Sequence, residues 1–329
     1  MMETIKTKAG RRLRYIKNAG ARETVRRVLL GSTGKTGLLF KALLYGLLIL
    51  LSFTFLYPIL YMLVNSFKSL SDLLNDSVKW IPTSFCLDNY TEALKVMKFS
   101  KTILQTLELS FIPALCQVVV AALTGYAFAR YRFPGRKLLL ALLVLTFVLP
   151  KQATMLPTYL MFKDMDLIGT LWAFVFPSAL GQGFNSAIIV LVFYQFYNQL
   201  PVSLVEAAQL DGCGHFKVFF YIALPAVGAA FLIGFLFSLV WYWNETYFTN
   251  IYIANTGIGN KHTMSTLLVE LTQFEASYKL LYEGQETVNY VNEAIRMAGT
   301  MVCIAPLLLI YFLLQRYFVQ SVDMVGIKD

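Results

Sequence analysis

Charged side chains are scarce in this sequence. Asp, Glu, Lys and Arg make up only 14% of its 329 residues, whereas hydrophobic residues make up 57%. A soluble globular protein has about 25% charged residues and about 45–50% apolar ones. The apolar surplus is gathered in long blocks that hold almost no charge. The composition therefore argues against a soluble globular fold and predicts a chain that is partly surrounded by lipid.

Cysteine and histidine are also rare. The chain has four cysteines and two histidines, and none of them forms a CxxC pair or a cluster with metal-ligand spacing. Cys116 and Cys303 lie inside apolar blocks, where a small buried hydrophobe is the simplest interpretation. His215 and His262 lie far apart in two loops, so the sequence lacks the clustered residues that an intramembrane enzyme needs. We expect neither a metal site nor a catalytic site in this chain.

A complete nucleotide-binding motif is missing as well. The stretch from Gly31 to Thr36 resembles the end of a phosphate-binding loop, but the glycine that this motif requires at its start is replaced by Leu29. No strand pattern precedes the stretch, and an apolar block follows it. We therefore expect no cofactor in this chain. If ATP drives its function, a partner binds the ATP and Mg²⁺.

Six apolar segments are long enough to cross a membrane, for which a helix needs roughly 20 residues. Most of them contain prolines or glycines, which membrane helices tolerate when neighbouring helices satisfy the freed backbone groups. The sequence predicts an all-α polytopic membrane protein with six transmembrane helices. They cover residues 40–64, 102–129, 138–161, 170–197, 218–248 and 295–314.

Basic residues are distributed unevenly among the loops, and the formal net charge is +9. Placing the N-terminus in the cytoplasm puts eighteen Lys and Arg residues on the inner side and eight on the outer side. Cytoplasmic loops carry such an excess, so both termini are predicted to be cytoplasmic in a multi-pass protein of the cell membrane. The loop 199–217 then faces the cytoplasm, and the loop 250–294 faces outward.

The predicted organisation has three parts. Residues 1–38 form a basic cytoplasmic leader, residues 39–320 the transmembrane domain, and residues 321–329 a cytoplasmic tail. Two interpretations of the leader stay open. Its basic residues fit an amphipathic helix on the anionic inner leaflet, or they serve only to orient the first span.

The cytoplasmic loop 199–217 carries the most informative string. It reads Glu-Ala-Ala-Gln-Leu-Asp-Gly from Glu206 to Gly212, and Leu224-Pro225 follows at the start of the next span. Ser203 and Glu206 have capping-box spacing, which predicts a helix from about Leu204, and Gly212 would end it. A short cytoplasmic helix with small residues suits docking into a partner's groove. The plainer interpretation is a connector in which Glu206 only caps its helix.

The whole string resembles the EAA motif of binding-protein-dependent ABC importer permeases. Further similarities lie in Trp80-Ile81-Pro82, in 125–130 and in the tail at 315–319, so that the chain from about residue 40 is similar to MalG-like carbohydrate permeases. Lys151 departs from the pattern, because the family tends to have an uncharged residue there. The resemblance implies a type I ABC importer permease fold with six transmembrane helices.

The resemblance also implies partners and contacts. The partners are a MalF-like second permease, two ABC ATPase subunits, an external solute-binding protein and the lipid bilayer, with no nucleic acid. The tail would contact the ATPase through Gln320, Gly326 and Lys328. The residues implied in coupling to the ATPase are Glu206, Ala207, Ala208, Leu210, Asp211, Gly212, His215, Leu224 and Pro225.

Polar and aromatic residues inside the spans are candidates for a sugar pathway, because intramembrane polar groups are costly and sugars bind by hydrogen bonds and stacking. Hydrogen bonds between helices are the competing explanation for such residues. The candidates are Gln182, Asn185, Tyr194, Trp243, Asn244 and Glu245. The outer loop 250–294 resembles the segment that contacts the binding protein, and a solvated acidic loop is its alternative.

The predicted function is the permease subunit of an ATP-driven sugar importer, with an oligosaccharide as its cargo, and not an enzyme by itself. A polyol, a glycerol phosphodiester or a uronate oligomer is the alternative cargo. A secondary transporter would need ion ligands or a proton relay at mid-membrane, and it would leave the string from Glu206 to Pro225 unexplained.

Overall fold

The computed structural model describes residues 31–32, 35–254, 264–283 and 291–326, and it divides the chain into two compact units, 1–64 and 65–329. Most of the leader, His262 in the outer loop and Lys328 in the tail lie outside the described residues. The described part is helical apart from one ladder of two-residue strands. The predicted all-α class is therefore confirmed.

In the first unit, a short ladder precedes a long helix. Strand β1 (Gly31–Ser32) pairs antiparallel with β2 (Lys35–Thr36), and α2 (Leu38–Ser66) follows. The described residues of the stretch that resembles a phosphate-binding loop thus form this ladder. Helix α2 has 29 residues, and at 1.5 Å per residue it is about 44 Å long, which is enough to cross a bilayer.

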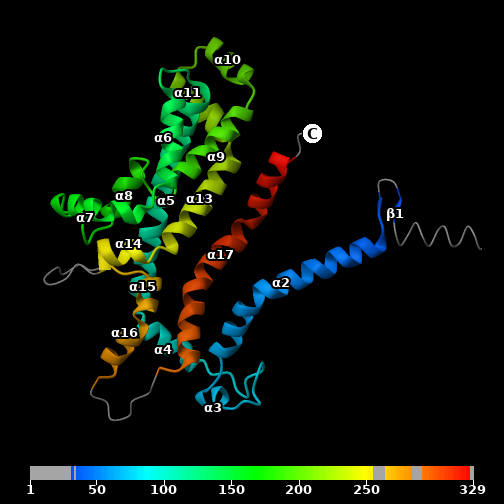
Figure 1. Ribbon diagram of the computed structural model, residues 1–329, viewed down its shortest axis with the longest axis vertical. Coiled ribbons are helices and arrows are strands. Elements are labelled where there is room, and N and C mark those ends of the chain that lie inside the picture. Colours follow the sequence, from blue (N-terminus) through cyan, green and yellow to red (C-terminus); the bar gives the residue numbers. More distant parts are fainter. Residues whose placement is uncertain (1–30, 33–34, 255–263, 284–290, 327–329) are drawn as a thin grey trace, which may run out of the picture. The chain divides into compact units, whose positions relative to one another are not determined.

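The second unit is built around α5 (Phe99–Arg130), against which α8 (Trp172–Ala179), α9 (Ser186–Gln199) and α13 (Gly228–Trp243) pack. Figure 1 shows these helices side by side. Helix α17 (Glu293–Gly326) packs along α13 and continues without a break into the predicted tail. Gln320 and Gly326 both lie on α17.

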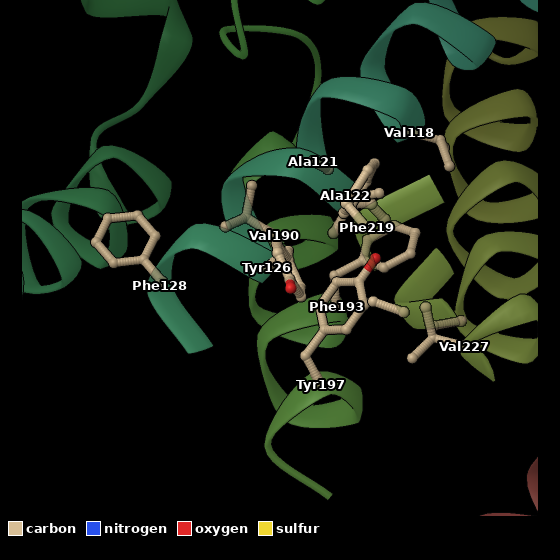
Figure 2. Packing of buried hydrophobic residues seen from close by; sticks show 13 residues of the cluster. Val118, Ala121, Ala122, Tyr126, Phe128, Val190, Phe193, Tyr197, Phe219 and Val227 are labelled. Atoms are coloured by element: carbon tan, nitrogen blue, oxygen red, sulfur yellow. The ribbon is translucent and has the colours of Figure 1, made fainter. Parts of the chain in front are cut away.

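Small residues let α5 and α9 approach closely, as at many helix contacts in membranes. A Cβ added at Gly125 would lie 2.6 Å from the Cβ of Phe193 and 3.0 Å from the backbone N of Tyr194. Beside this contact, the ring of Tyr126 lies 5.2 Å from those of Tyr197 and Phe219, measured between centroids. Figure 2 shows the resulting apolar cluster between the helices. This cluster fixes the positions of the segments that follow α9.

Bends interrupt several of the predicted spans. Three described helices are long and apolar enough to cross a membrane, and six spans result if each of three bent pairs counts as one. The pairs are Arg136–Val148 with Lys151–Asp164, bent by 93°, Ser186–Gln199 with Val202–Leu210, bent by 74°, and His215–Ala226 with Gly228–Trp243, bent by 77°.

Three spans predicted as single helical segments need correction, and one of them, 218–248, is bent by 77° between Ala226 and Gly228. The segment 138–161 is broken at Pro150 into α6 (Arg136–Val148), the 3₁₀ turn η1 (Lys151–Thr154) and α7 (Met155–Asp164). The segment 170–197 is broken between α8 and α9. Proline lacks the N–H that continues a helix. The second break holds Gly181 at a φ of +78°, a backbone conformation that favours glycine.

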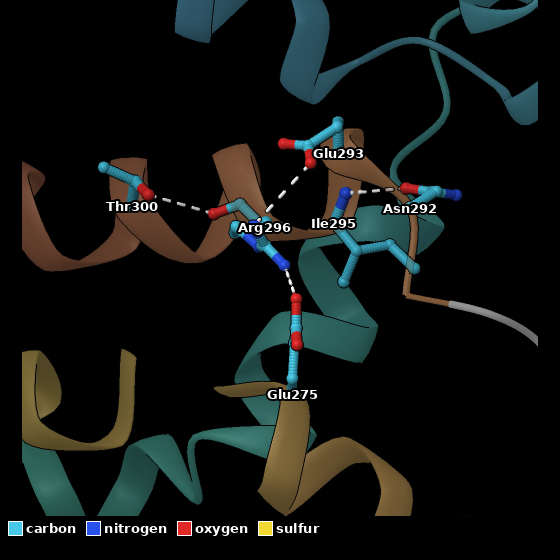
Figure 3. A network of polar contacts seen from close by, with 6 residues as sticks. All are labelled: Glu275, Asn292, Glu293, Ile295, Arg296 and Thr300. Atoms are coloured by element: carbon cyan, nitrogen blue, oxygen red, sulfur yellow. Dashed lines mark hydrogen bonds and ion pairs between the residues drawn. The ribbon is translucent and has the colours of Figure 1, made fainter. Parts of the chain in front are cut away.

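Short helices gather at one end of the long ones and include α3 (Leu70–Leu73), α4 (Asp88–Val96), α15 (Leu267–Thr272) and α16 (Phe274–Leu281). Arg296 on α17 joins α16 through an ion pair with Glu275 and lies 3.7 Å from Glu293 (Figure 3). Asn292 accepts a 2.9 Å bond from the N–H of Ile295, which caps the start of α17. The described part of the outer segment is therefore folded onto α17.

At the opposite end lie α10 (Val202–Leu210) and α11 (His215–Val218) (Figure 1). The chain then passes through the π-helical turn η2 (Phe219–Ala223) and α12 (Leu224–Ala226) into α13. After α13, α14 (Tyr247–Thr249) and the π-helical turn η3 (Asn250–Ala254) complete the described elements. The 199–217 loop therefore lies at the opposite end of these helices from α15 and α16, which belong to the described part of the 250–294 segment.

Candidate functional site

The loop 199–217 forms a short helix whose start differs from the predicted one. Helix α10 begins at Val202 directly after Pro201, and no side chain caps it. The capping box of Ser203 and Glu206 is therefore wrong, because Ser203 already lies inside the first turn. Pro201, with a φ of −58°, fixes the backbone that enters the helix.

The end of α10 is as predicted. Gly212 has a φ of +83°, and its N–H bonds the carbonyl of Gln209 at 3.0 Å while the N–H of Cys213 bonds that of Ala208 at 3.0 Å. These two bonds form a Schellman motif, which ends a helix with a glycine in the left-handed conformation. The motif turns the chain sharply into α11.

The turn presents a mixed polar and apolar surface. Among the implied coupling residues, Ala208 is buried and Leu224 half-buried, whereas Glu206, Ala207, Leu210, Asp211, Gly212, His215 and Pro225 are exposed. Leu210 is 89% exposed, and Phe216 beside it in the loop is 78% exposed. Apolar side chains gathered at the tip of a loop in this way mark interaction surfaces.

The loop is attached to the helix bundle at both ends. The guanidinium of Arg130, at the end of α5, donates to the carbonyl of Leu200 at 2.7 Å. The imidazole of His215 lies edge-on to the ring of Tyr131, 5.7 Å between centroids. A displacement of α10 and α11 would therefore also move α5 and the C-terminal end of α9, which directly precedes the loop.

A second candidate site lies at the break between α8 and α9, where side chains of other helices satisfy the irregular backbone. Gln117 of α5 donates to the carbonyl of Phe184 at 2.7 Å and accepts from the hydroxyl of Tyr242 at 3.0 Å. The same hydroxyl lies 2.6 Å from the Ser178 hydroxyl and 3.3 Å from the backbone N of Phe184. Irregular backbone inside a membrane protein requires such partners.

Gly183 allows this network to form. A Cβ at this position would lie 2.3 Å from the side-chain oxygen of Gln117 and 2.6 Å from the hydroxyl of Tyr242. Any other residue here would displace the two groups that hold the break. Position 183 thus requires glycine, because the side chains of Gln117 and Tyr242 lie too close to its backbone for a Cβ.

The break opens into a cavity of about 360 Å³. Lys151 of η1 points toward the break, since its Nζ donates to the carbonyl of Gly183 at 3.0 Å and lies 4.3 Å from the ring centroid of Phe184. Glu245 lines the same cavity and accepts a 2.8 Å bond from the N–H of Phe248. The other polar or aromatic lining residues include Thr146, Gln152, Gln182, Asn185, Ser186 and Trp241.

The structure separates the predicted pathway residues into two groups. Gln182, Asn185 and Glu245 line the cavity, whereas Tyr194, Trp243 and Asn244 do not. The hydroxyl of Tyr194 lies 3.4 Å from the guanidinium of Arg136. Trp243 is buried, and its indole N–H donates to the carbonyl of Cys303 at 3.3 Å. Asn244 bonds the carbonyl of Val240, within its own helix turn.

Sequence reasoning missed Lys151, Gln152, Ser186 and Trp241 as lining residues. For Lys151 the signal was available, because a charged residue in the middle of a predicted span is by default a functional candidate. The other three gave no such signal, since their place beside the break depends on the fold. Among the described residues, no three or more His, Cys, Asp or Glu side chains are grouped to hold a metal ion.

Residues 117–324, which include the cavity and the cytoplasmic loop, match the family described as "Binding-protein-dependent transport system inner membrane component". The chain belongs to this family. The family consists of transport permeases, which are not catalytic themselves. Membership makes this permease a membrane component of an ABC importer and implies a partner permease, an ATPase and a binding protein.

Curated relatives cover most of the permease. The polygalacturonan/rhamnogalacturonan transport system permease protein YtcP of Bacillus subtilis (strain 168) is 28% identical over 291 residues, which are 88% of this chain and 98% of YtcP. The arabinooligosaccharides transport system permease protein AraQ of Halalkalibacterium halodurans is 25% identical over 285 residues, 84% of this chain and 93% of AraQ.

A solved structure shows the same fold. It is a chain of a bacterial ABC transporter involved in the import of the acidic polysaccharide alginate, and it superposes with a TM-score of 0.66 at 18% sequence identity. The match covers 85% of this chain and 96% of that chain. The predicted type I ABC permease fold is thereby confirmed.

Proposed function

We propose that this permease imports an oligosaccharide and that the import is driven by ATP that partner subunits hydrolyse. Helix α10, with its glycine turn, is the element that couples ATP hydrolysis to transport. The observation that carries the proposal is the Schellman-terminated α10, which exposes Glu206 and Leu210 on a loop attached to α5. The carbohydrate cargo is supported by the names of two relatives, which specify polygalacturonan/rhamnogalacturonan for YtcP and arabinooligosaccharides for AraQ. A cavity that combines hydrogen-bonding and aromatic groups supports it as well.

In this proposal ATP and Mg²⁺ are bound by two ATPase subunits, and this chain binds neither. The exposed Leu210 and Phe216 enter a groove of an ATPase, because their burial there removes apolar surface from water. Closure of the ATPases moves α10, and the contact of Arg130 with Leu200 passes the movement to α5. The permease alternates between an inward-open and an outward-open state. ATP-bound ATPase subunits shift this equilibrium only as far as they bind one of the two states more tightly than the other.

The other contacts follow from the same arrangement. The two permeases enclose the solute path, and the binding protein delivers its solute to the end that carries α15 and α16. The C-terminal part of α17, with Gln320 and Gly326, and the following Lys328 add a contact to the ATPase. Both termini are then cytoplasmic, and the basic leader lies on the inner side.

The test is co-purification of the tagged permease, co-expressed with the genes that flank its own. We would compare the wild type with Glu206→Lys and with the matched charge reversal Glu283→Lys, an exposed glutamate at the opposite end of the helices. In the wild type we expect recovery of an ATPase that the binding protein stimulates. Recovery of the ATPase should be lost in Glu206→Lys and kept in Glu283→Lys. A wild-type chain that carries solute without any ATPase would instead support a secondary transporter.

A further inference from the structure

Lys151 places a positive charge at a break in a membrane-spanning segment. It is the first residue of η1, at the 93° bend between α6 and α7, and its side chain is partly buried. An ammonium group has three hydrogen-bond donors, and the described residues supply one acceptor for them, the carbonyl of Gly183 at 3.0 Å. The remaining donors are available to a ligand in the cavity.

The acidic residue of the cavity does not form an ion pair with this lysine. Among the described residues, no oxygen of Glu245 lies within the 4.0 Å that defines an ion pair with Lys151. One carboxylate oxygen of Glu245 instead accepts the N–H of Phe248 at 2.8 Å, within its own segment. The charges of Lys151 and Glu245 attract each other across the cavity, but no direct ion pair neutralises the ammonium group, which leaves it able to bind a negative group on a ligand.

A helix terminus adds to this positive potential. Helix α9, 14 residues long, begins at Ser186 in the wall of the cavity, and no side chain caps its first turn. The N-terminus of a helix carries a partial positive charge and free N–H groups, which favour anions. Broken helices of transporters direct such termini at the anionic groups of their substrates.

An unsatisfied hydroxyl lies at the same place. Ser186 is only 6% exposed, and its Oγ has no hydrogen-bond partner among the described residues. Buried polar atoms are nearly always paired. The residue before it, Asn185, has a φ of +52°, a left-handed conformation that asparagine adopts more readily than most other residues. The orphaned hydroxyl in the cavity wall is consistent with a ligand that completes the site.

We infer that this cavity binds the carboxylate of an acidic sugar unit, between the ammonium group of Lys151 and the first turn of α9. Gln152 and Gln182 face the sugar hydroxyls, and the indole of Trp241 provides a stacking surface. The inference rests on the proposed function and narrows its cargo to uronate-containing oligosaccharides. It also assigns a substrate contact to this permease rather than to its partner alone.

The experiment uses the complete importer in lipid vesicles, with its binding protein, and measures uptake of two labelled sugars. One is a galacturonate trisaccharide, and the other is the same trisaccharide with its carboxylates reduced to alcohols. The variants are Lys151→Gln and Ser186→Ala, and the matched control is Lys163→Gln, an exposed lysine of α7. Glutamine keeps a donor for the carbonyl of Gly183 but removes the charge.

We expect Lys151→Gln to lower uptake of the galacturonate trisaccharide about tenfold or more, because it removes a charge-assisted hydrogen bond. Ser186→Ala should lower it less, and Lys163→Gln should not change it. Uptake of the reduced trisaccharide, relative to wild type, should be unaffected by Lys151→Gln. The purified complexes should keep the wild-type melting temperature.

Four results would overturn the inference. Equal losses for both sugars would make Lys151 a structural residue of the break, and unchanged uptake of the acidic sugar would remove it from the path. A wild type that takes up only neutral sugars would refute the acidic cargo while the proposed function stands. A wild type whose ATPase the binding protein does not stimulate, and which takes up no sugar, would refute both.

Discussion

The hydroxyl of Tyr242 offers the most direct test of how hydrogen bonds stabilise the break between α8 and α9. It interacts with three groups: the side-chain oxygen of Gln117, the hydroxyl of Ser178 and the backbone N–H of Phe184, at 3.0, 2.6 and 3.3 Å. The substitution Tyr242→Phe removes these interactions and keeps the ring. We expect it to destabilise the break without creating a cavity.

The magnitude follows from the number of bonds. Hydrogen bonds between side chains in a membrane protein contribute about 0.6 kcal/mol each on average, so the loss of three costs about 2 kcal/mol. For a domain of roughly this size, 1 kcal/mol corresponds to about 2–4 °C in melting temperature. The melting temperature of the variant should therefore fall by about 4–8 °C.

The assay is thermal unfolding of the purified importer, followed by a fluorescent label on this subunit. The matched control is Tyr252→Phe, which removes the same atom from a buried tyrosine of the same apolar cluster. Among the described residues, the hydroxyl of Tyr252 has no hydrogen-bond partner. Its ring packs against the same aromatic neighbour as Tyr242, since its centroid lies 6.2 Å from that of Phe174. The control should therefore melt close to the wild type.

A double-mutant cycle decides whether the network is the cause. Tyr242→Phe combined with Gln117→Leu should cost less than the two single substitutions added together, because both remove the same bond. Equal melting temperatures for Tyr242→Phe and Tyr252→Phe, or strictly additive losses in the cycle, would refute the reasoning. The break would then be held by apolar packing alone.

Three further predictions concern other parts of the chain. Gly125→Ala should cost about 1–3 kcal/mol, because its Cβ would lie 2.6 Å from a side chain of α9, whereas Gly228→Ala, with nothing within 4 Å, should melt near the wild type. Gly212→Ala should recover less ATPase in co-purification than Gly212→Asn, since asparagine tolerates the φ of +83°. The hydroxyl of Thr83 donates to Asp72 and lowers the pKa of that carboxyl. The stability that this bond contributes is present above the unfolded pKa of about 3.9 and is lost as the pH falls through the lower folded value. Thermal unfolding between pH 3 and 6 should therefore show less acid sensitivity in Asp72→Asn.

The sequence predicted those features that local chemistry decides. Long apolar blocks determine the spans, and Gly212 ends α10 because a left-handed residue is needed there. The start of the same helix was placed two residues too late. Capping-box spacing is a weak local signal, and Pro201 fixes the helix start more strongly through its locked φ.

Features that depend on contacts distant in sequence were not predictable. Tyr242 and Gln117 are 125 positions apart, and nothing in the sequence shows that they meet at Phe184. Trp243 and Tyr242 are neighbours in an apolar run, yet one packs toward α17 and the other holds the break. Which of the two residues packs and which belongs to the site depends on the helix face that each occupies. This face is known only once the neighbouring helices are placed.

The break and the proposed binding site have the same physical origin. In a continuous helix from α8 through α9, the N–H groups around Ser186 would bond carbonyls one turn earlier and would not face the cavity. The interruption at 180–185 leaves only short-range acceptors for two of these donors, because the N–H of Ser186 reaches the carbonyl of Gly183 at 3.4 Å and that of Ile188 reaches the carbonyl of Asn185 at 3.0 Å. The carbonyl of Gly183 also accepts from Lys151. Gln117 and Tyr242 offset the cost of the irregular backbone from the opposite side. The interruption therefore places the first turn of α9 at the cavity wall, while the side chains of Gln117 and Tyr242, which do not line the cavity, stabilise the irregular backbone.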